Sequence, residues 1–344
     1  MERAGVSGPG KSTRKVTFMP RRLEIRAENW PIAGRFAISR GAKTEAALLV
    51  AEIHDGTAVG RGECVPYARY GESLPRVIGS LMGIRMGIED GLTRAELAEA
   101  LSPGAARNAL DCALWDLEAK LAGKPVHVLA GLPEPKPVTT AFTLSLDTPE
   151  AMAVAAHSAK RPVLKLKLGA GGDIERLRAI RAAVPDAVLI ADANEGWNEQ
   201  NIEANLRACA EVNVALVEQP LPADKDEILR TIPRLVPVCA DESFHDRTSF
   251  DAVAGKYDAL NIKLDKTGGF TEALYVANEA EKRGFALMLG CMVSTSLAMA
   301  PAMLLAARAK FVDLDGPLLL ERDRTPSLRY EGSLVYPPSP EVWG

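Results

Sequence analysis

Three acidic residues, Asp192, Glu218 and Asp241, end three successive short apolar segments of the sequence. If these segments are neighbouring parallel strands, the three carboxylates meet at one edge of the sheet, where their mutual repulsion requires a cation. One acidic residue after a strand is ordinarily the N-cap of the next helix, but three in register favour a metal site. Because all the donors are oxygens, the pattern predicts one Mg²⁺ ion per subunit.

Three lysines flank this predicted metal site along the chain. Lys165 and Lys167 lie two residues apart on one apolar segment, so both side chains point to the same side, with Cα atoms about 6.6 Å apart. Lys263 ends a later segment. A lysine buried beside another cation has a lowered pKa and becomes a usable base near neutral pH. The pattern predicts proton abstraction next to a carboxylate, through an enediolate that the metal holds. The alternative is that the lysines only form structural ion pairs with the acids.

The elements that would position these residues are short strands alternating with helices. Eight apolar segments begin about every 25 residues and alternate with segments of helical spacing. These apolar segments are Thr139–Leu144, Val163–Leu168, Ala187–Asp192, Val214–Glu218, Val236–Asp241, Ala259–Leu264, Phe285–Leu289 and Phe311–Asp315. Near-continuous apolar strands are typical of parallel sheets buried on both faces, so we predict an α/β fold with a (β/α)₈-type, TIM-like barrel.

The first part of the chain has a different pattern. Alternation with period two from Leu23 to Tyr67, interrupted at Asp55-Gly56, predicts an antiparallel hairpin, and a leucine stripe predicts a helix over Gly104–Ala122. We therefore predict four parts along the chain. They are a disordered N-terminal tail at 1–20, an α+β capping domain at 21–135, the barrel at 136–319 and a C-terminal segment at 320–344 that packs back on the capping domain.

The composition argues against several classes of protein. The 344 residues are 47% hydrophobic and 25% charged with a formal net charge of −4, and no basic surface for nucleic acid is evident. No apolar segment is long enough for a membrane span, and the N-terminus lacks a secretory signal. The five cysteines are scattered, so we expect reduced thiols in a cytoplasmic protein. Residues 5–12 fit a P-loop pattern without its flanking strand and helix, so nucleotide binding is not expected.

Three segments carry a resemblance to a known family. They are CVPYARYGES at 64–73, AARNALDCALW at 105–115 and NIKLDKTGG at 261–269. With them the chain resembles the enolase superfamily, its muconate-lactonizing-enzyme subgroup and, within that subgroup, the dipeptide epimerases that act on L-Ala-Glu. The resemblance extends from about Glu24 to Pro317.

The resemblance implies a role for each candidate residue. The three acidic residues would bind Mg²⁺, Lys167 and Lys263 would be the two acid/base groups, and Lys165 would tune Lys167. Asp313 and Asp315 would bind the free ammonium group of a dipeptide substrate. The implied reaction is epimerisation of L-Ala-D-Glu to L-Ala-L-Glu by 1,1-proton transfer at the α-carbon of the second residue, within murein peptide metabolism. Assembly into a homo-oligomer is also implied.

Two positions depart from the family pattern. Relatives specific for an acidic second residue usually carry an arginine in the loop between the first strands, where this chain has Lys43. Lysine keeps the charge but lacks the bidentate fork, so we expect a looser preference for Glu. The alternative is that Lys43 is an ordinary solvated side chain. Leu297 stands where a more polar residue is expected, and nothing in the sequence explains its effect.

Other functions stay open at this point. Cycloisomerases and o-succinylbenzoate synthases of the same subgroup share the two lysines but bind no ammonium group, so Asp313 and Asp315 favour a dipeptide. A non-catalytic barrel that binds a metal or ligand would be expected to lack one of the lysines. The mandelate racemase and sugar-acid dehydratase branches use a histidine from the seventh strand, and this sequence has no histidine after His245.

Overall fold

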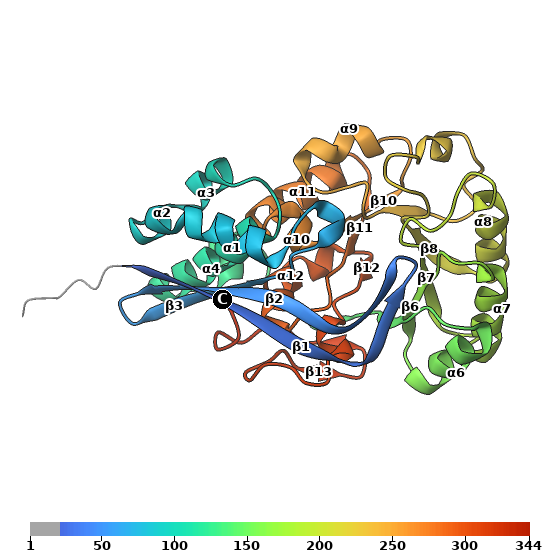
Figure 1. Cartoon of the computed structure of the whole chain (residues 1–344), viewed down its shortest axis with the longest axis horizontal. Helices are drawn as coiled ribbons and strands as arrows, with labels where there is room; N and C mark the ends of the chain where they lie inside the picture. The colour runs from blue at the N-terminus through green and yellow to red at the C-terminus, as the bar shows by residue number, and fades with distance from the viewer. Residues whose placement is uncertain (1–20) are drawn as a thin grey trace, which may run out of the picture.

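The computed structural model describes residues 21–344, so the predicted disordered tail and the P-loop-like residues lie outside the described residues. Two lobes lie side by side, with the N-terminal elements at the left of Figure 1 and the strands and helices of the second lobe at the right. All five cysteines are free thiols. Among residues 21–344, no helix is long and apolar enough to cross a membrane.

The second lobe is built around an eight-stranded parallel sheet with the strand order β12-β11-β10-β9-β8-β7-β6-β5. Its strands are β5 (Phe142–Leu144), β6 (Val163–Lys167), β7 (Val188–Asp192), β8 (Val214–Glu218), β9 (Val238–Ala240), β10 (Ala259–Ile262), β11 (Ala286–Leu289) and β12 (Phe311–Val312). The backbone N–H of Ala141 donates to Val312 O at 2.8 Å, which joins the two edges of the curled sheet. The predicted barrel fold is confirmed.

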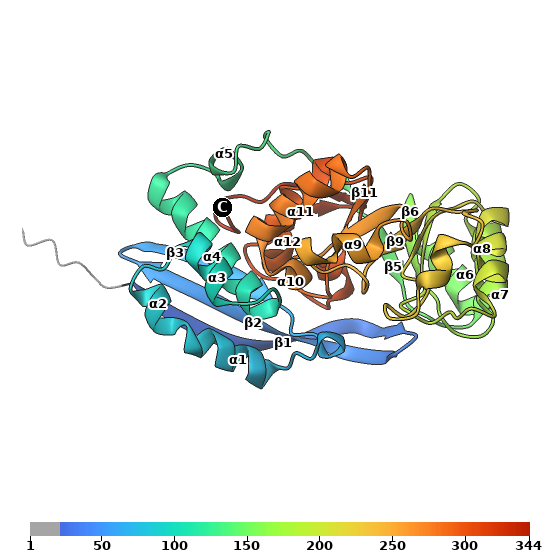
Figure 2. The same ribbon diagram turned by 90° about the horizontal axis from the view of Figure 1, so that it is seen from above.

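Helices cover the outside of this sheet (Figures 1 and 2). They are α6 (Pro149–Ala159), α7 (Asp173–Ala183), α8 (Ile202–Glu211), α9 (Phe250–Val253), α10 (Leu264–Thr267), α11 (Phe270–Lys282) and α12 (Ser296–Met303), with the short 3₁₀ helices η2 (Glu227–Arg230), η3 (Arg247–Ser249) and η4 (Ala306–Arg308). A further 3₁₀ helix, η5 (Gly316–Leu319), follows the last strand at the carboxyl end of the barrel. Alternate strand residues such as Leu164 and Leu166 are buried in the large core, whereas Ile190 and Leu216 belong to a small apolar cluster formed by the strands themselves. Burial on both faces explains why the strands read as continuous apolar runs.

The N-terminal lobe combines a three-stranded antiparallel sheet with helices. Its strands are β1 (Arg22–Ile38), β2 (Gly41–Asp55) and β3 (Ala58–Cys64), and its helices are η1 (Ala68–Tyr70), α1 (Leu74–Gly83), α2 (Arg85–Glu89), α3 (Arg94–Ala100), α4 (Ala105–Ala122) and α5 (Val126–Leu129). Asp55 pairs with Ala58, as expected for the predicted turn, and Gly123 ends α4 in the left-handed region. Gly60 and Gly62 let β3 approach α4 closely, because a Cβ at Gly62 would lie 2.0 Å from Ala109 O.

The hairpin of β1 and β2 reaches from the N-terminal lobe to the barrel (Figures 1 and 2). Arg40, at its tip, donates to Asn194 O at 2.7 Å, after β7, and to Glu242 Oε1 at 2.7 Å, after β9. Ser39 Oγ donates to the same carbonyl at 3.0 Å. The hairpin tip is therefore held against the carboxyl ends of the barrel strands.

The C-terminal residues contact both lobes. Strands β13 (Tyr330–Glu331) and β14 (Leu334–Val335) form a small sheet with β4 (Val138–Thr139). Trp343 is buried and its Nε1 donates to Cys112 O of α4 at 3.0 Å. The middle of this C-terminal segment therefore pairs with β4, which precedes the first barrel strand, while its end lies against the N-terminal lobe.

Candidate active site

The register of the barrel strands places charged side chains directly above an apolar layer. Ile190 and Leu216 lie in the apolar cluster inside the barrel, and Asp192 and Glu218 follow two residues later on the same strands. Since side chains two residues apart on a strand point to the same side, each carboxylate lies above its apolar neighbour inside the barrel. The paired register of Lys167 with Asp192, and of Asp192 with Glu218, puts these residues at one level.

The three predicted metal ligands are almost completely buried. Asp192 and Glu218 have no exposed surface, and Asp241 is 1% exposed. Burial raises the pKa of Asp192, but Lys167 and Lys165 outweigh it and lower the pKa to about 2. Burial and the neighbouring Asp192 raise the pKa of Glu218 to about 7. The carboxylates therefore differ strongly in how well nearby cations compensate their charge.

The predicted lysines lie among these carboxylates. Lys165 Nζ is 2.8 Å from Glu218 Oε2 and 3.2 Å from Asp192 Oδ2, and Lys167 Nζ is 2.6 Å from Asp192 Oδ2. Lys263 Nζ is 2.7 Å from Asp241 Oδ2. Lys167 is on β6 and Lys263 follows β10, so the three carboxylate-bearing strands lie between the two lysines in the sheet.

The expectation of a lowered pKa is wrong for Lys165 and Lys263. Burial lowers the pKa of Lys165, but Asp313, Glu218 and Asp192 raise it well above its ordinary value. For Lys263, burial is likewise outweighed by Asp241, and its pKa is raised. The physical reason is that carboxylates lie within 3.2 Å of these ammonium groups.

The structure places Asp313 and Asp315 beside the same group of charges. Asp313 Oδ2 is 2.6 Å from Lys165 Nζ, while its Oδ1 is buried without a hydrogen-bond partner among the described residues. Asp315 Oδ2 accepts from Thr143 N at 2.6 Å. Burial and the neighbouring Asp313 raise the pKa of Asp315 to about 7. The pair offers an unused acceptor and a carboxyl group that titrates near neutrality.

A cavity of about 860 Å³ opens above these residues and is closed on one side by the N-terminal lobe. Lys165, Lys167 and Lys263 line it together with Asp241, Asp313 and Asp315. Lys43 also lines it, with Nζ 5.4 Å from the centre of the Tyr67 ring. Asp192 and Glu218 lie beneath this surface. The structure thus brings all nine predicted site residues to one end of the barrel.

The donor set fits a divalent cation. Three carboxylates from adjacent strands supply only oxygen ligands, which hard cations such as Mg²⁺ prefer. Glu218 Oε2 is buried without a well-directed hydrogen bond from residues 21–344, and so is Asn194 Oδ1, two residues after Asp192. These oxygens have the chemistry of ligands. Asp192, Glu218 and Asp241 are the residues that would hold the ion.

Several residues of this site were not predicted from the sequence. Lys266 is buried and donates to Asp241 Oδ1 at 2.5 Å, and Asn261 Nδ2 donates to Glu218 Oε1 at 2.8 Å. The segment 261–269 contains both residues, and its many polar side chains at the end of a strand could have indicated that they belong to the site. Arg40 gives no such signal, because only the folding of the hairpin onto the barrel brings it near Glu242.

Leu297 lies away from the cavity. It is 3% exposed in α12 and borders a separate small cavity beside Trp30 and Arg324. Its departure from the family pattern therefore adds no contact to the site above the strands.

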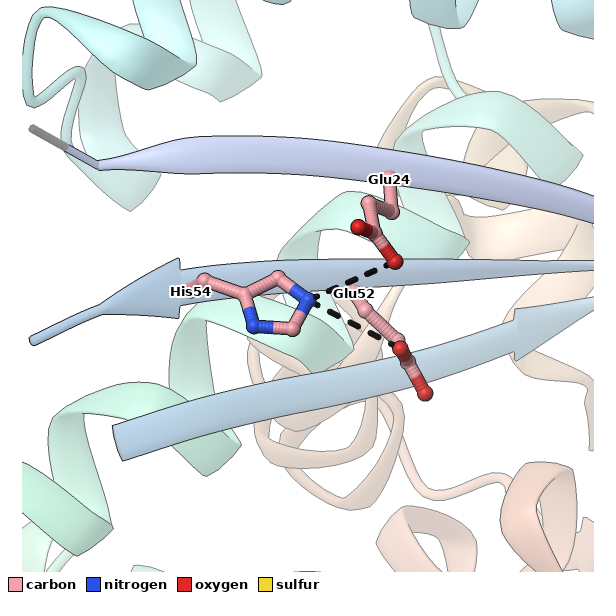
Figure 3. Close-up of side chains that lie close together, drawn as sticks. All are labelled: Glu24, Glu52 and His54. Atoms are coloured by element: carbon pink, nitrogen blue, oxygen red, sulfur yellow. Dashed lines mark ion pairs between the residues drawn. The ribbon is translucent and has the colours of Figure 1, made fainter. Parts of the chain in front are cut away.

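A second group of possible metal ligands lies on the capping sheet. Figure 3 shows Glu24 of β1 beside Glu52 and His54 of β2, with His54 Nε2 3.6 Å from Glu24 Oε2 and 3.8 Å from Glu52 Oε2. Arg26 donates two hydrogen bonds of 2.8 Å to Glu52. A guanidinium already compensates this carboxylate, and none of the three residues borders the barrel cavity, so we assign no metal site here.

Two models of known families together match most of the chain. The family model described as "Mandelate racemase / muconate lactonizing enzyme, N-terminal domain" matches residues 21–131. The model described as "Enolase C-terminal domain-like" matches residues 150–338.

Two curated relatives match nearly the full length. L-Ala-D/L-Glu epimerase from Escherichia coli (strain K12) is 46% identical over 313 residues, which cover 90% of this chain and 98% of that protein. N-acetyl-D-glutamate racemase from a Pseudoalteromonas species is 44% identical over 302 residues, which cover 86% of this chain and 95% of that protein. By these names, both relatives are isomerases.

Solved structures share the fold. An enolase family member from Agrobacterium tumefaciens with homology to dipeptide epimerases, with bound sodium and L-Ala-L-Glu, is 53% identical with a TM-score of 0.93, covering 94% of this chain and 100% of that chain. A dipeptide epimerase from Enterococcus faecalis V583, complexed with Mg and L-Leu-L-Tyr, is 30% identical with a TM-score of 0.86, covering 93% of this chain and 98% of that chain.

Proposed function

This chain belongs to the mandelate racemase/muconate lactonizing enzyme family of the enolase superfamily, and from that membership we propose that it epimerises dipeptides at the α-carbon of the second residue. One observation carries the proposal. Two buried lysines lie on either side of three carboxylate-bearing strands, and both lysines line a cavity that Asp241, Asp313 and Asp315 also line. The substrate we favour is L-Ala-D-Glu, with L-Ala-L-Glu as the product.

The two lysines act on opposite faces of the α-carbon in this proposal. Lys167 Nζ removes the α-proton from one epimer, and the bond electrons move into the neighbouring carboxylate to give a planar enediolate. Lys263 then donates a proton to the other face of the same carbon, and the roles reverse in the return reaction. Lys165, which lies among Glu218, Asp192 and Asp313, tunes the charge beside Lys167.

The other residues bind the substrate or hold the metal. One Mg²⁺ ion per subunit, held by Asp192, Glu218 and Asp241, would stabilise negative charge on the substrate carboxylate. Asp313 and Asp315 bind the ammonium group, since Asp313 Oδ1 is a buried acceptor that no described residue uses. Cycloisomerases and o-succinylbenzoate synthases need no such acceptor.

Racemisation of an N-acylated glutamate is the second candidate function. A raised pKa of about 7 keeps Asp315 partly protonated near neutrality, so it could donate a hydrogen bond to an acyl oxygen as well as accept from an ammonium group. A relative 44% identical to this chain is named N-acetyl-D-glutamate racemase. The two candidates differ only in what Asp313 and Asp315 bind.

Deuterium exchange distinguishes the candidates. The protein is incubated in D₂O with Mg²⁺ and either a dipeptide library or N-acetyl-D-glutamate, and mass spectrometry records which compounds gain one deuterium. We expect L-Ala-D-Glu to gain deuterium faster than N-acetyl-D-glutamate. Faster exchange of the acetylated compound would favour the second candidate, and no exchange in any compound would indicate a non-catalytic barrel.

Single-lysine variants test the division of roles. Lys167→Ala and Lys263→Ala should both lose epimerisation, and any remaining α-proton exchange should occur on opposite epimers. If either variant still interconverts epimers at a substantial rate, or if both exchange the same epimer, another group must supply the second proton. A role in murein peptide metabolism and assembly into a homo-oligomer stay predictions from the family, and a cytoplasmic location stays a prediction from the sequence.

A further inference from the structure

Gln219 follows Glu218 at the carboxyl end of β8 and has no exposed surface. Its backbone has a φ of +34°, a region that residues other than glycine seldom adopt. A fully buried amide in an unusual backbone conformation, next to a predicted metal ligand, requires an explanation from its hydrogen bonds.

The side-chain oxygen of Gln219 binds the main chain of the neighbouring strand end. Oε1 accepts from the backbone N–H of Asp241 at 2.9 Å and from that of Ser243 at 3.0 Å. Asp241 is the third predicted metal ligand. The amide therefore connects the residue after one ligand directly to the backbone of another.

The orientation of this amide is fixed chemically. Backbone N–H groups can only donate, so the oxygen must face Asp241 and the nitrogen must face away. On that side Nε2 is 2.8 Å from Leu221 O, 2.8 Å from Ser243 Oγ and 3.0 Å from Tyr257 OH. Both hydroxyls can donate to Asp226 Oδ2, at 2.8 and 2.7 Å, which leaves their lone pairs for the amide.

The main chain of Gln219 completes the connection to the strands on both sides. Its N–H donates to Cys239 O of β9 at 2.9 Å, and its carbonyl accepts from Glu195 N, beyond β7, at 2.9 Å. Gln219 thus bonds to the carboxyl ends of both strands that adjoin its own.

We propose that Gln219 is a positioning residue that holds the ends of β7, β8 and β9, and with them the three carboxylates, at the spacing a divalent metal ion needs. Mg²⁺ requires near-ideal octahedral geometry with short bonds, so small shifts between strand ends weaken binding. Three carboxylates that repel one another would otherwise separate. This inference rests on the metal site of the proposed function, and it assigns Gln219 no contact with substrate.

Metal binding without substrate is the direct test. Gln219→Met keeps the length of the side chain but removes the amide, and we expect the dissociation constant for Mg²⁺, measured by isothermal titration calorimetry, to rise about 10- to 100-fold. If Gln219→Met does not fold, Gln219→Asn replaces it, because the shorter side chain cannot reach both N–H groups.

A matched control separates positioning from general stability. Asp116 in α4 is also buried and accepts from two backbone N–H groups, those of Arg61 at 2.8 Å and Gly344 at 2.7 Å. Asp116→Leu should lower the unfolding temperature without changing the dissociation constant for Mg²⁺. The positioning role is wrong if Gln219→Met binds Mg²⁺ as tightly as the native protein, or if Asp116→Leu weakens binding equally. If the native protein binds no divalent metal, the proposed metal site itself is wrong.

Discussion

Lys43 should set the preference for an acidic second residue of the dipeptide. It lies on β2 opposite Phe36 of β1 and borders the barrel cavity. Arg40 and Arg69 also border the cavity on the side of the N-terminal lobe, but both already form ion pairs with Glu195. Lys43 forms no ion pair within residues 21–344, so its charge is available to a substrate carboxylate.

The expected size of the effect follows from the exposure of Lys43. Two unit charges 4 Å apart attract by about 1 kcal/mol in water and about 4 kcal/mol at an effective dielectric constant of 20. Lys43 is exposed, so the lower figure applies, and Lys43→Met should reduce kcat/KM for L-Ala-D-Glu by about fivefold. Lys43→Glu adds a repulsion of similar size, about 2 kcal/mol in total, or about a 30-fold reduction.

The assay compares L-Ala-D-Glu with L-Ala-D-Gln, which has the same shape without the charge. The ratio of the two kcat/KM values should fall in Lys43→Met and Lys43→Glu, and Lys43→Arg should keep it. The effect should shrink at high salt, because exposed charges are screened. Lys124→Glu is the control, since it makes the same change of net charge at another exposed lysine. An unchanged ratio in Lys43→Glu, or an equal loss for both substrates, would refute the reasoning.

Three further outcomes are expected. Chelation of divalent metal should abolish turnover and added Mg²⁺ should restore it, because without a cation the three clustered carboxylates repel a substrate carboxylate. Full activity of a protein that contains no metal by elemental analysis would contradict the proposed metal site. Gly62→Ala should lower the free energy of unfolding, measured in urea, by about 1–3 kcal/mol, because the new Cβ would lie 2.0 Å from Ala109 O. Gly79→Ala is the control: a Cβ on this glycine of α1 meets open space, so the free energy of unfolding should rise slightly. Burial raises the pKa of Asp111 to about 6, above its unfolded value near 4, so this group favours folding at low pH and loses that contribution as the pH rises through 6. Relative to Asp111→Asn, the native protein should therefore lose about 2–3 kcal/mol between pH 4 and 7, and a flat difference would contradict the assigned burial cost.

Much of the fold was predictable because its signals are periodic and local. The eight apolar segments became β5 to β12, and membership of the enolase superfamily, predicted from three short segments, is confirmed. Segment ends were less accurate: the segment Phe311–Asp315 contains a strand only at Phe311–Val312, and a 3₁₀ helix follows at Gly316–Leu319. The limits of the four predicted parts of the chain stay predictions.

The candidate site, like the fold, was predictable from the sequence only in part. Asp192, Glu218 and Asp241 could be grouped from the sequence, because strand alternation and parallel order place them together. Arg40 and Gln219 could not, because their partners come from other parts of the chain or are backbone groups without a sequence signal. The direction of the pKa shift of a buried lysine was also not predictable, since it depends on which charges lie within a few ångströms.

The two lobes therefore have separate tasks in the proposed reaction. The lysines and carboxylates that would act on the α-carbon belong to the barrel, whose strand ends are cross-linked by hydrogen bonds such as those of Gln219. The substrate side chain would instead meet the hairpin of β1 and β2, where Lys43 is exposed and Arg40 holds the tip to the barrel. A substitution on the hairpin can change which side chain is accepted without moving a strand end. The two relatives described above are both named for a glutamate and differ in the group on its nitrogen, which in this proposal would face Asp313 and Asp315 of the barrel and not the hairpin.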